Sequence, residues 1–230
     1  MFQFLQPYPI YSISGFTEPF SSLSHLLAAL AFLVMAAFLI HRGRGNKARV
    51  FFLTIFSFAC FFQLTMSGVY HLLDPGDGRD VLQRLDHAAI FALIAGSFTS
   101  VHGLLFKGFM RWGILLILWT IAITGMTLKS IYFNEVPEWI SLATYLGLGW
   151  IGVITAHGLY KHYGMSYVRP LVYSGLAYTI GAVLEFLHAP ILVTGVIGSH
   201  ELFHIAVIIG VTLHWRFTWR FADGSAKPLA

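Results

Sequence analysis

Apolar residues fill seven long stretches of this chain, and short polar or glycine-rich segments separate them. Each stretch approaches the roughly 20 residues that a helix needs to cross the hydrocarbon core of a bilayer. The pattern therefore predicts an all-α integral membrane protein, with residues 1–230 forming one bundle of seven transmembrane helices. The predicted spans are residues 22–40, 50–73, 85–105, 112–131, 140–160, 171–188 and 199–217.

The segments between the spans contain residues that end helices or form turns. Residues 74–78 read Asp-Pro-Gly-Asp-Gly and predict a turn after the second span. Arg169 and Pro170 precede the sixth span, and residues 189–198, which are apolar, leave the boundary between the last two spans the least defined. The short C-terminal tail, residues 223–230, is expected to be mobile.

Composition supports the same class of protein. Hydrophobic residues make up 57% of the chain and charged residues 10%, whereas roughly a quarter of a soluble domain is charged. The single cysteine, Cys60, excludes an intramolecular disulfide and is expected to fill space in the core. Residues 1–6 contain no basic residue, so we expect no cleavable signal peptide. The net charge of +4 comes from short loops, so no nucleic-acid partner is expected.

The basic residues divide unequally between the two sides of the membrane. Eleven of the 14 Lys and Arg residues fall in the C-terminal tail or in the loops after the first, third and fifth spans. The opposite side, with the N-terminal tail, holds the other three: Arg79, Arg84 and Lys129. Because cytoplasmic loops carry an excess of Lys and Arg, the count predicts an outside N-terminus and a cytoplasmic C-terminus.

The clearest candidate site is a set of polar residues at the ends of apolar spans. His200 and His204 lie four residues apart, on one helix face and about 6 Å apart along the axis. Alternation of the spans brings His71, at the end of the second span, and Asp86, at the start of the third, to the same membrane face. Ser67 lies one turn deeper than His71 on the same face of its helix. Ionisable residues inside a membrane segment are costly, so this set is a functional candidate.

These residue types favour a zinc site with one open position. His71, His200 and His204 would supply three imidazole nitrogens, and water would take the fourth position. Asp86 would accept a hydrogen bond from that water and act as general base, while Ser67 would hold the water or orient a substrate carbonyl. Neutral imidazole also suits copper, iron and nickel, so the pattern does not fix the metal.

Most other histidines have a simpler interpretation. Histidines in membrane helices commonly form hydrogen bonds between helices or at the interface, and we expect this of His102, His157 and His214. A structural role is also favoured for three histidines near the predicted site: His25, His87 and His188.

Four separated motifs carry a resemblance to a known family. Residues 18–25 resemble the opening Glu-x-x-Asn-x-x-Ser/Thr-His of the hemolysin III family, with Ser21 in place of the asparagine. Residues 67–71 resemble its Ser-x-x-x-His, residues 85–99 its third-span signature, and residues 200–204 its final His-x-x-x-His. This family belongs with the progestin and adiponectin receptors and, more distantly, with the alkaline ceramidases.

The resemblance implies a barrel-like bundle of seven helices that holds zinc. The implied ligands are His71, His200 and His204, and Asp86 and Ser67 are implied to hold the zinc-bound water. A lipid amide, as in ceramides, is the substrate that the resemblance suggests. The adiponectin receptors have a cytoplasmic N-terminus, opposite to the orientation that the charge count predicts.

Four functions follow from these observations. The first is a membrane-embedded zinc hydrolase acting on a lipid amide bond. The second is an intramembrane zinc protease, because residues 200–204 also read His-Glu-x-x-His, with Glu201 as the base and Asp86 or Asp74 as a distant ligand. The third is a receptor or lipid-homeostasis protein in which zinc only joins helices. The fourth, a pore-forming toxin, is disfavoured because no amphipathic segment suits pore assembly. The substrate and the oligomeric state cannot be read from the sequence.

Overall fold

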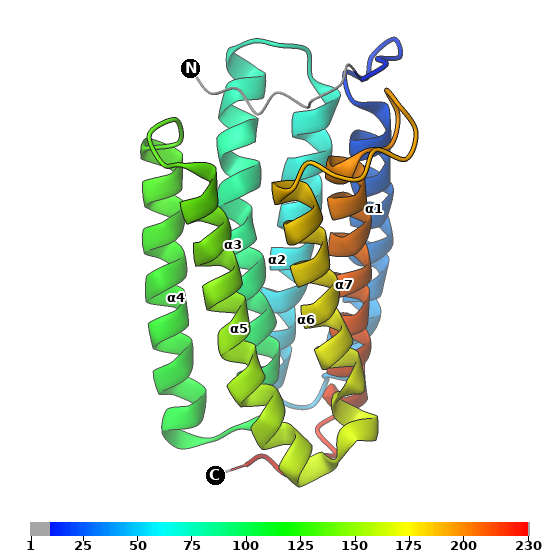
Figure 1. The fold of residues 1–230 in the computed structure, drawn as a ribbon. Helices are drawn as coiled ribbons and strands as arrows, with labels where there is room; N and C mark the ends of the chain where they lie inside the picture. Colours follow the sequence, from blue (N-terminus) through cyan, green and yellow to red (C-terminus); the bar gives the residue numbers. More distant parts are fainter. Residues whose placement is uncertain (1–9, 230) are drawn as a thin grey trace.

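Seven long helices, running side by side, make up most of the computed structural model, which describes residues 10–229 (Figure 1). Residues 1–6, for which no signal peptide is expected, lie outside the described range. The helices are α1 (Pro19–Arg42), α2 (Lys47–Leu72), α3 (Asp77–Leu105), α4 (Gly108–Ile131), α5 (Glu138–Tyr163), α6 (Met165–Phe186) and α7 (Ser199–Phe221). Successive helices run in opposite directions, so the all-α bundle is as predicted.

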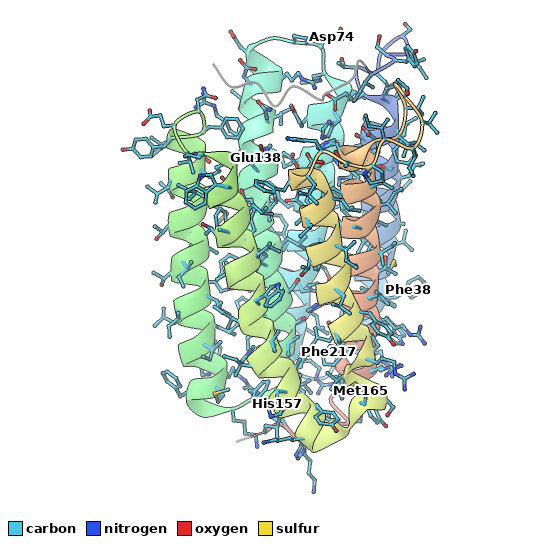
Figure 2. The ribbon with its side chains drawn as sticks, in the orientation of Figure 1. Phe38, Asp74, Glu138, His157, Met165 and Phe217 are labelled. Atoms are coloured by element: carbon cyan, nitrogen blue, oxygen red, sulfur yellow. The ribbon has the colours of Figure 1, made fainter. Side chains whose placement is uncertain are left out.

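Six of the seven helices, all except α6, are long and apolar enough to cross a membrane. Three tyrosines, Arg169 and Glu185 lower the mean hydropathy of α6, which nevertheless packs lengthwise against α5 and α7 (Figure 1). Large apolar side chains such as Phe38 point away from the bundle (Figure 2). An apolar outer surface suits a bilayer as the surrounding solvent, and the fold is therefore that of a multi-pass membrane protein.

Helix α3 lies at the centre and packs against α2, α4, α5 and α7. Small residues allow the close approach, because few side-chain atoms separate the helix backbones. At Gly96 an added Cβ would lie 2.5 Å from the Cβ of Ala59, and at Gly103 it would lie 2.3 Å from the ring of Phe52. The junction of α2 and α3 therefore depends on glycine at these positions. Helices α4 and α5 pack on α3 more than on each other.

A pair of glycine substitutions tests this packing. Gly96→Ala is expected to destabilise the bundle by about 1–3 kcal/mol, because the new methyl overlaps α2. Gly158→Ala, where nothing lies within 4 Å of the added Cβ, is expected to be neutral or stabilising by up to about 1 kcal/mol through helix propensity. Thermal unfolding of both variants in the same detergent measures the difference. Equal unfolding temperatures would argue against a tight α2–α3 contact.

Two helix starts differ from the prediction by six residues or more. Helix α3 begins at Asp77, eight residues earlier than the predicted span, because the acidic Asp77 and Asp80 favour a helix N-terminus. Helix α6 includes Arg169 and Pro170, which were predicted to precede it. Pro170 has no N–H to donate to the carbonyl of Ser166; Arg220 of α7 donates to that carbonyl instead, at 2.8 Å.

The C-terminal tail is held against the bundle rather than mobile as expected. Arg42 forms an ion pair with Asp223 at 2.9 Å, and the backbone N–H of Leu229 donates to the carbonyl of Leu105 at 2.8 Å. The tail closes the end of the bundle that carries most of the basic residues. The opposite end holds the loops after α2, α4 and α6 (Figure 1). Which end faces the cytoplasm stays a prediction.

Candidate metal centre

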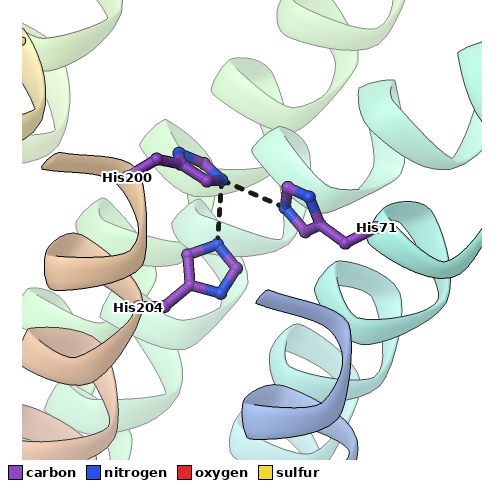
Figure 3. Close-up of side chains that lie close together, drawn as sticks. All are labelled: His71, His200 and His204. Atoms are coloured by element: carbon purple, nitrogen blue, oxygen red, sulfur yellow. Dashed lines mark hydrogen bonds between the residues drawn. The ribbon is translucent and has the colours of Figure 1, made fainter. Parts of the chain in front are cut away.

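Three histidines from two helices meet near one end of the bundle (Figure 3). His71 comes from the last turn of α2, and His200 and His204 come from the first two turns of α7. The Nε2 atom of His200 lies 3.2 Å from Nε2 of His71 and 3.0 Å from Nε2 of His204. The structure thus brings together the three residues that the sequence predicted as ligands.

The spacing of these nitrogens suits a single ion. Two nitrogens bound to zinc at about 2.05 Å with a tetrahedral angle lie about 3.3 Å apart. One potential ligand atom from each histidine lies within 4.8 Å of the others, so small side-chain rotations suffice to bring all three to one ion. Within residues 10–229 no other group of three His, Cys, Asp or Glu residues is this compact.

Two carboxylates, those of Glu18 and Glu185, contact the Nδ1 atoms of two of these rings. Neither residue has a role in the sequence-based prediction. Glu18, just before α1, lies with Oε2 2.5 Å from Nδ1 of His71. Glu185, in the last turn of α6, lies with Oε1 2.9 Å from Nδ1 of His200. Burial tends to raise the pKa of the Glu18 carboxyl, whereas the hydrogen bond from His71 and the positive charge of Arg79 lower it. The ion pair with Arg79 favours the carboxylate form of Glu18.

The third ring is fixed by stacking. His25 of α1 lies over His204 with ring centroids 3.9 Å apart and an angle of 23° between the planes. Its Nε2 lies 3.4 Å from the backbone oxygen of His204. His25 is buried and lies in the predicted neighbourhood of the site, where it supports the ring of His204. The structural role expected for it fits this position.

Asp86 and Ser67 lie beside the histidines as the sequence suggested. Asp86 is buried in α3, and its Oδ1 accepts a hydrogen bond from Nε2 of Gln63 at 3.1 Å. Ser67 lines the same cavity and lies close enough to interact with this carboxyl. Nδ1 of His87 contacts the carbonyl of Gln83 at 2.9 Å and lies 3.8 Å from Oδ2 of Asp86. Asp86 and Ser67 thus line the same cavity as the three imidazoles.

All of these residues face one cavity of about 510 Å³ inside the bundle. From the histidines it extends along α3 to Val101, with mainly apolar walls. Trp150 and Val153 of α5 and Leu176 of α6 line the cavity and are at least half exposed. The walls that α5 and α6 contribute are therefore not sealed from the surroundings.

Glu201, the general base in the protease alternative, accepts two hydrogen bonds that hold it in a different place. Its Oε2 accepts a hydrogen bond from the backbone N–H of Gly198 at 2.9 Å, which caps the first turn of α7. Its Oε1 accepts from the hydroxyl of Ser21 at 3.1 Å. Ser21, at the position where the family pattern has asparagine, thus ties α1 to α7. These bonds give Glu201 a structural role and leave it outside the cavity lining.

The remaining histidines lie away from the centre. His102 contacts the Thr155 hydroxyl at 3.1 Å, and His214 contacts the Ser100 hydroxyl at 3.1 Å. Both are bonds between helices, as expected. His188, expected at the end of the sixth span, lies in the exposed connection after α6. His157 is exposed on α5.

Comparison with known proteins agrees with the motifs and the fold. A family described as "Haemolysin-III related" matches residues 14–215, a range that includes all three clustered histidines. The chain belongs to the haemolysin-III related family. "Hemolysin-3" of Bacillus cereus is 27% identical over 169 residues, which cover 70% of this chain and 77% of that protein. "Hemolysin-3 homolog" of Bacillus subtilis (strain 168) is 30% identical over 157 residues, which cover 68% and 71%. The haemolysin-III resemblance predicted from the four motifs is confirmed.

Proposed function

We propose that this haemolysin-III related chain is a membrane-embedded, zinc-dependent hydrolase that cleaves an amide bond in a lipid. One observation carries the proposal: three imidazoles converge at the wall of a cavity that Asp86 and Ser67 also line. A purely structural zinc site would fill its fourth position with protein. Here the three imidazoles face a cavity of about 510 Å³, which is large enough for a small-molecule ligand.

The protonation of the rings supports a cation at this point. Carboxylates only accept hydrogen bonds, so Nδ1 of His71 and of His200 carries the proton, and Nε2 of each neutral ring is an acceptor. Two acceptors 3.2 Å apart repel each other unless a cation lies between them. A proton can bridge two of the nitrogens, whereas a metal ion can bind all three. The donor set therefore fits a divalent ion.

The charge of the cavity supports the same conclusion. Three carboxyl groups of the cavity lining, those of Glu18, Asp86 and Glu185, interact with the three histidines, and among the described residues the lining contains no Lys or Arg. Buried charges in proteins are paired or coordinate metals. Arg79 bonds to Glu18 from outside the lining, which leaves an acidic excess. A divalent cation would balance it.

The residues around the ion can then be assigned. When bound, zinc would supply Lewis-acid activation of a water and of the scissile carbonyl. Asp86 would take the proton of the attacking water and pass it to the nitrogen of the leaving amine, giving a carboxylic acid and an amine. Ser67 would hold the Asp86 carboxylate and orient the water. The apolar walls would bind the acyl chain and exclude bulk water.

The lipid amide is the substrate that the fold and the family favour together. The exposed apolar side chains that α5 and α6 contribute to the cavity wall would give a lipid access without leaving the bilayer. The resemblance to alkaline ceramidases supports an amide. Purified protein is expected to release fatty acid and long-chain amine in equal amounts from a ceramide, detected by mass spectrometry, with activity lost in a chelator and restored by Zn²⁺. Absence of both products from a panel of N-acyl lipids would contradict the proposal.

Glu201→Gln separates this function from a zinc protease. The amide can keep one acceptor for the cap of α7, so we expect lipid-hydrolase activity within a few-fold of wild type and a loss of stability of about 0.5–2 kcal/mol. If Glu201 were the base, the variant would lose about 10²- to 10⁴-fold in rate. Activity and thermal unfolding measured on the same preparation distinguish the two outcomes.

A further inference from the structure

We infer that Glu18 and Glu185 are positioning residues of the metal centre, holding His71 and His200 with Nε2 turned toward the ion. This inference rests on the proposed function, because it assigns roles around the proposed ion. Neither carboxylate touches the ion in this assignment. Glu18 acts on the ring of His71 and Glu185 acts on the ring of His200. Glu18 lies just before α1 and Glu185 lies in α6, and neither helix supplies a proposed ligand.

Glu18 is the more firmly fixed of the two. Its backbone N–H donates to the carbonyl of His71 at 3.0 Å, so the residue is attached to the ligand by backbone as well as by side chain. Its second carboxylate oxygen, Oε1, accepts a hydrogen bond from Arg79 of α3. Arg79 also donates to the carbonyl of Leu73 at 2.5 Å and lies over the ring of Tyr70. The carboxylate is therefore held from both sides before any ion arrives.

Glu185 is held more loosely. Its Oε1 bonds to His200 at 2.9 Å, and its buried Oε2 has no hydrogen-bond partner among the described residues. It stands at the end of α6, next to the exposed connection that leads to α7. The bond between Glu18 and His71 therefore joins the start of α1 to α2. The bond between Glu185 and His200 joins the end of α6 to α7.

The physical effect of such a bond is well defined. A carboxylate that accepts from Nδ1–H fixes the tautomer and the ring orientation, and it raises the basicity of Nε2. Loss of such a partner weakens metal binding by about 10- to 100-fold. Because Glu18 is fixed by more contacts, its replacement is expected to weaken binding more than replacement of Glu185.

The test is the affinity of purified full-length protein for Zn²⁺, measured by competition with a chromophoric chelator. Glu18→Gln and Glu185→Gln are each expected to bind Zn²⁺ about 10- to 100-fold more weakly than wild type. Glu138→Gln is the matched control: Glu138 lines the same cavity but forms no hydrogen bond or ion pair with the three histidines, so its affinity is expected to match wild type. Equal affinities for all three variants and wild type would overturn the inference.

Two further measurements separate positioning from folding and from the proposed function. The visible spectrum of bound Co²⁺ reports ligand geometry, and it is expected to change in Glu18→Gln and Glu185→Gln but not in Glu138→Gln. Metal-free samples should unfold at similar temperatures in Glu185→Gln and Glu138→Gln. An unaltered Co²⁺ spectrum in both positioning variants would overturn the inference. If wild type itself binds neither ion, the proposed function fails as well; if wild type binds and the variants bind equally, only this inference fails.

Discussion

His200→Ala is expected to lower the affinity for Zn²⁺ by about 100- to 1,000-fold and to abolish hydrolysis. Binding free energies of about 10–16 kcal/mol for four-ligand zinc sites correspond to about 2.5–4 kcal/mol for each ligand. His200 is the ligand whose Nε2 lies within 3.2 Å of both other Nε2 atoms. Its removal leaves His71 and His204 without their common neighbour and removes the hydrogen bond to Glu185.

The measurement is a Zn²⁺ titration against a competing chelator, with His157→Ala as the matched control. His157 is an exposed histidine on α5, so its loss is expected to leave the affinity unchanged. The result that contradicts the assignment is a His200→Ala protein that binds Zn²⁺ as tightly as wild type. In that case the three rings would form an interhelical hydrogen-bond cluster and not a metal centre.

Asp86→Asn is expected to lose about 10²- to 10⁴-fold in hydrolysis while keeping its metal. The amide has the shape of the carboxylate but cannot take a proton from water. Gln63 and Ser67 can still bond to the amide, so the fold around it should persist. A large loss of rate with unchanged metal content would show that the centre performs chemistry.

Asp80→Asn on the same helix is the control for Asp86→Asn. Asp80 is exposed in the first turn of α3, and its replacement is expected to leave the rate unchanged. If Asp86→Asn instead retains full activity, Asp86 is not the general base. If neither variant nor wild type shows hydrolysis, and all three bind zinc, the receptor-like alternative with a structural ion is favoured.

The helices and the meeting of the three histidines follow directly from the sequence. Apolar stretches of membrane length define the helices, and the alternating direction of successive helices puts His71 and His200 at one end. The i, i+4 spacing from His200 then places His204 on the same helix face. Local sequence patterns predict poorly where a distant residue supplies a missing hydrogen bond. Pro170 cannot donate to the carbonyl of Ser166, but it lies inside α6 because Arg220 of α7 donates to that carbonyl instead.

The supporting residues could not be predicted, because their partners are set by packing. Glu18 and His71 are 53 residues apart, and Ser21 and Glu201 are 180 residues apart. No periodicity encodes which carboxylate faces which ring. One signal was present: Glu185 is an ionisable residue near the end of an apolar stretch, and such a residue needs a partner inside the bundle.

Elemental analysis of purified wild-type protein, alongside His71→Ala and His204→Ala, tests the metal centre most directly. The expected result is about one zinc ion per wild-type chain, retained through dialysis, and a large loss in both variants. A wild-type protein that contains no transition metal, and takes up none when Zn²⁺ is supplied, would contradict the proposed centre. So would a metal content that the two histidine substitutions leave unchanged.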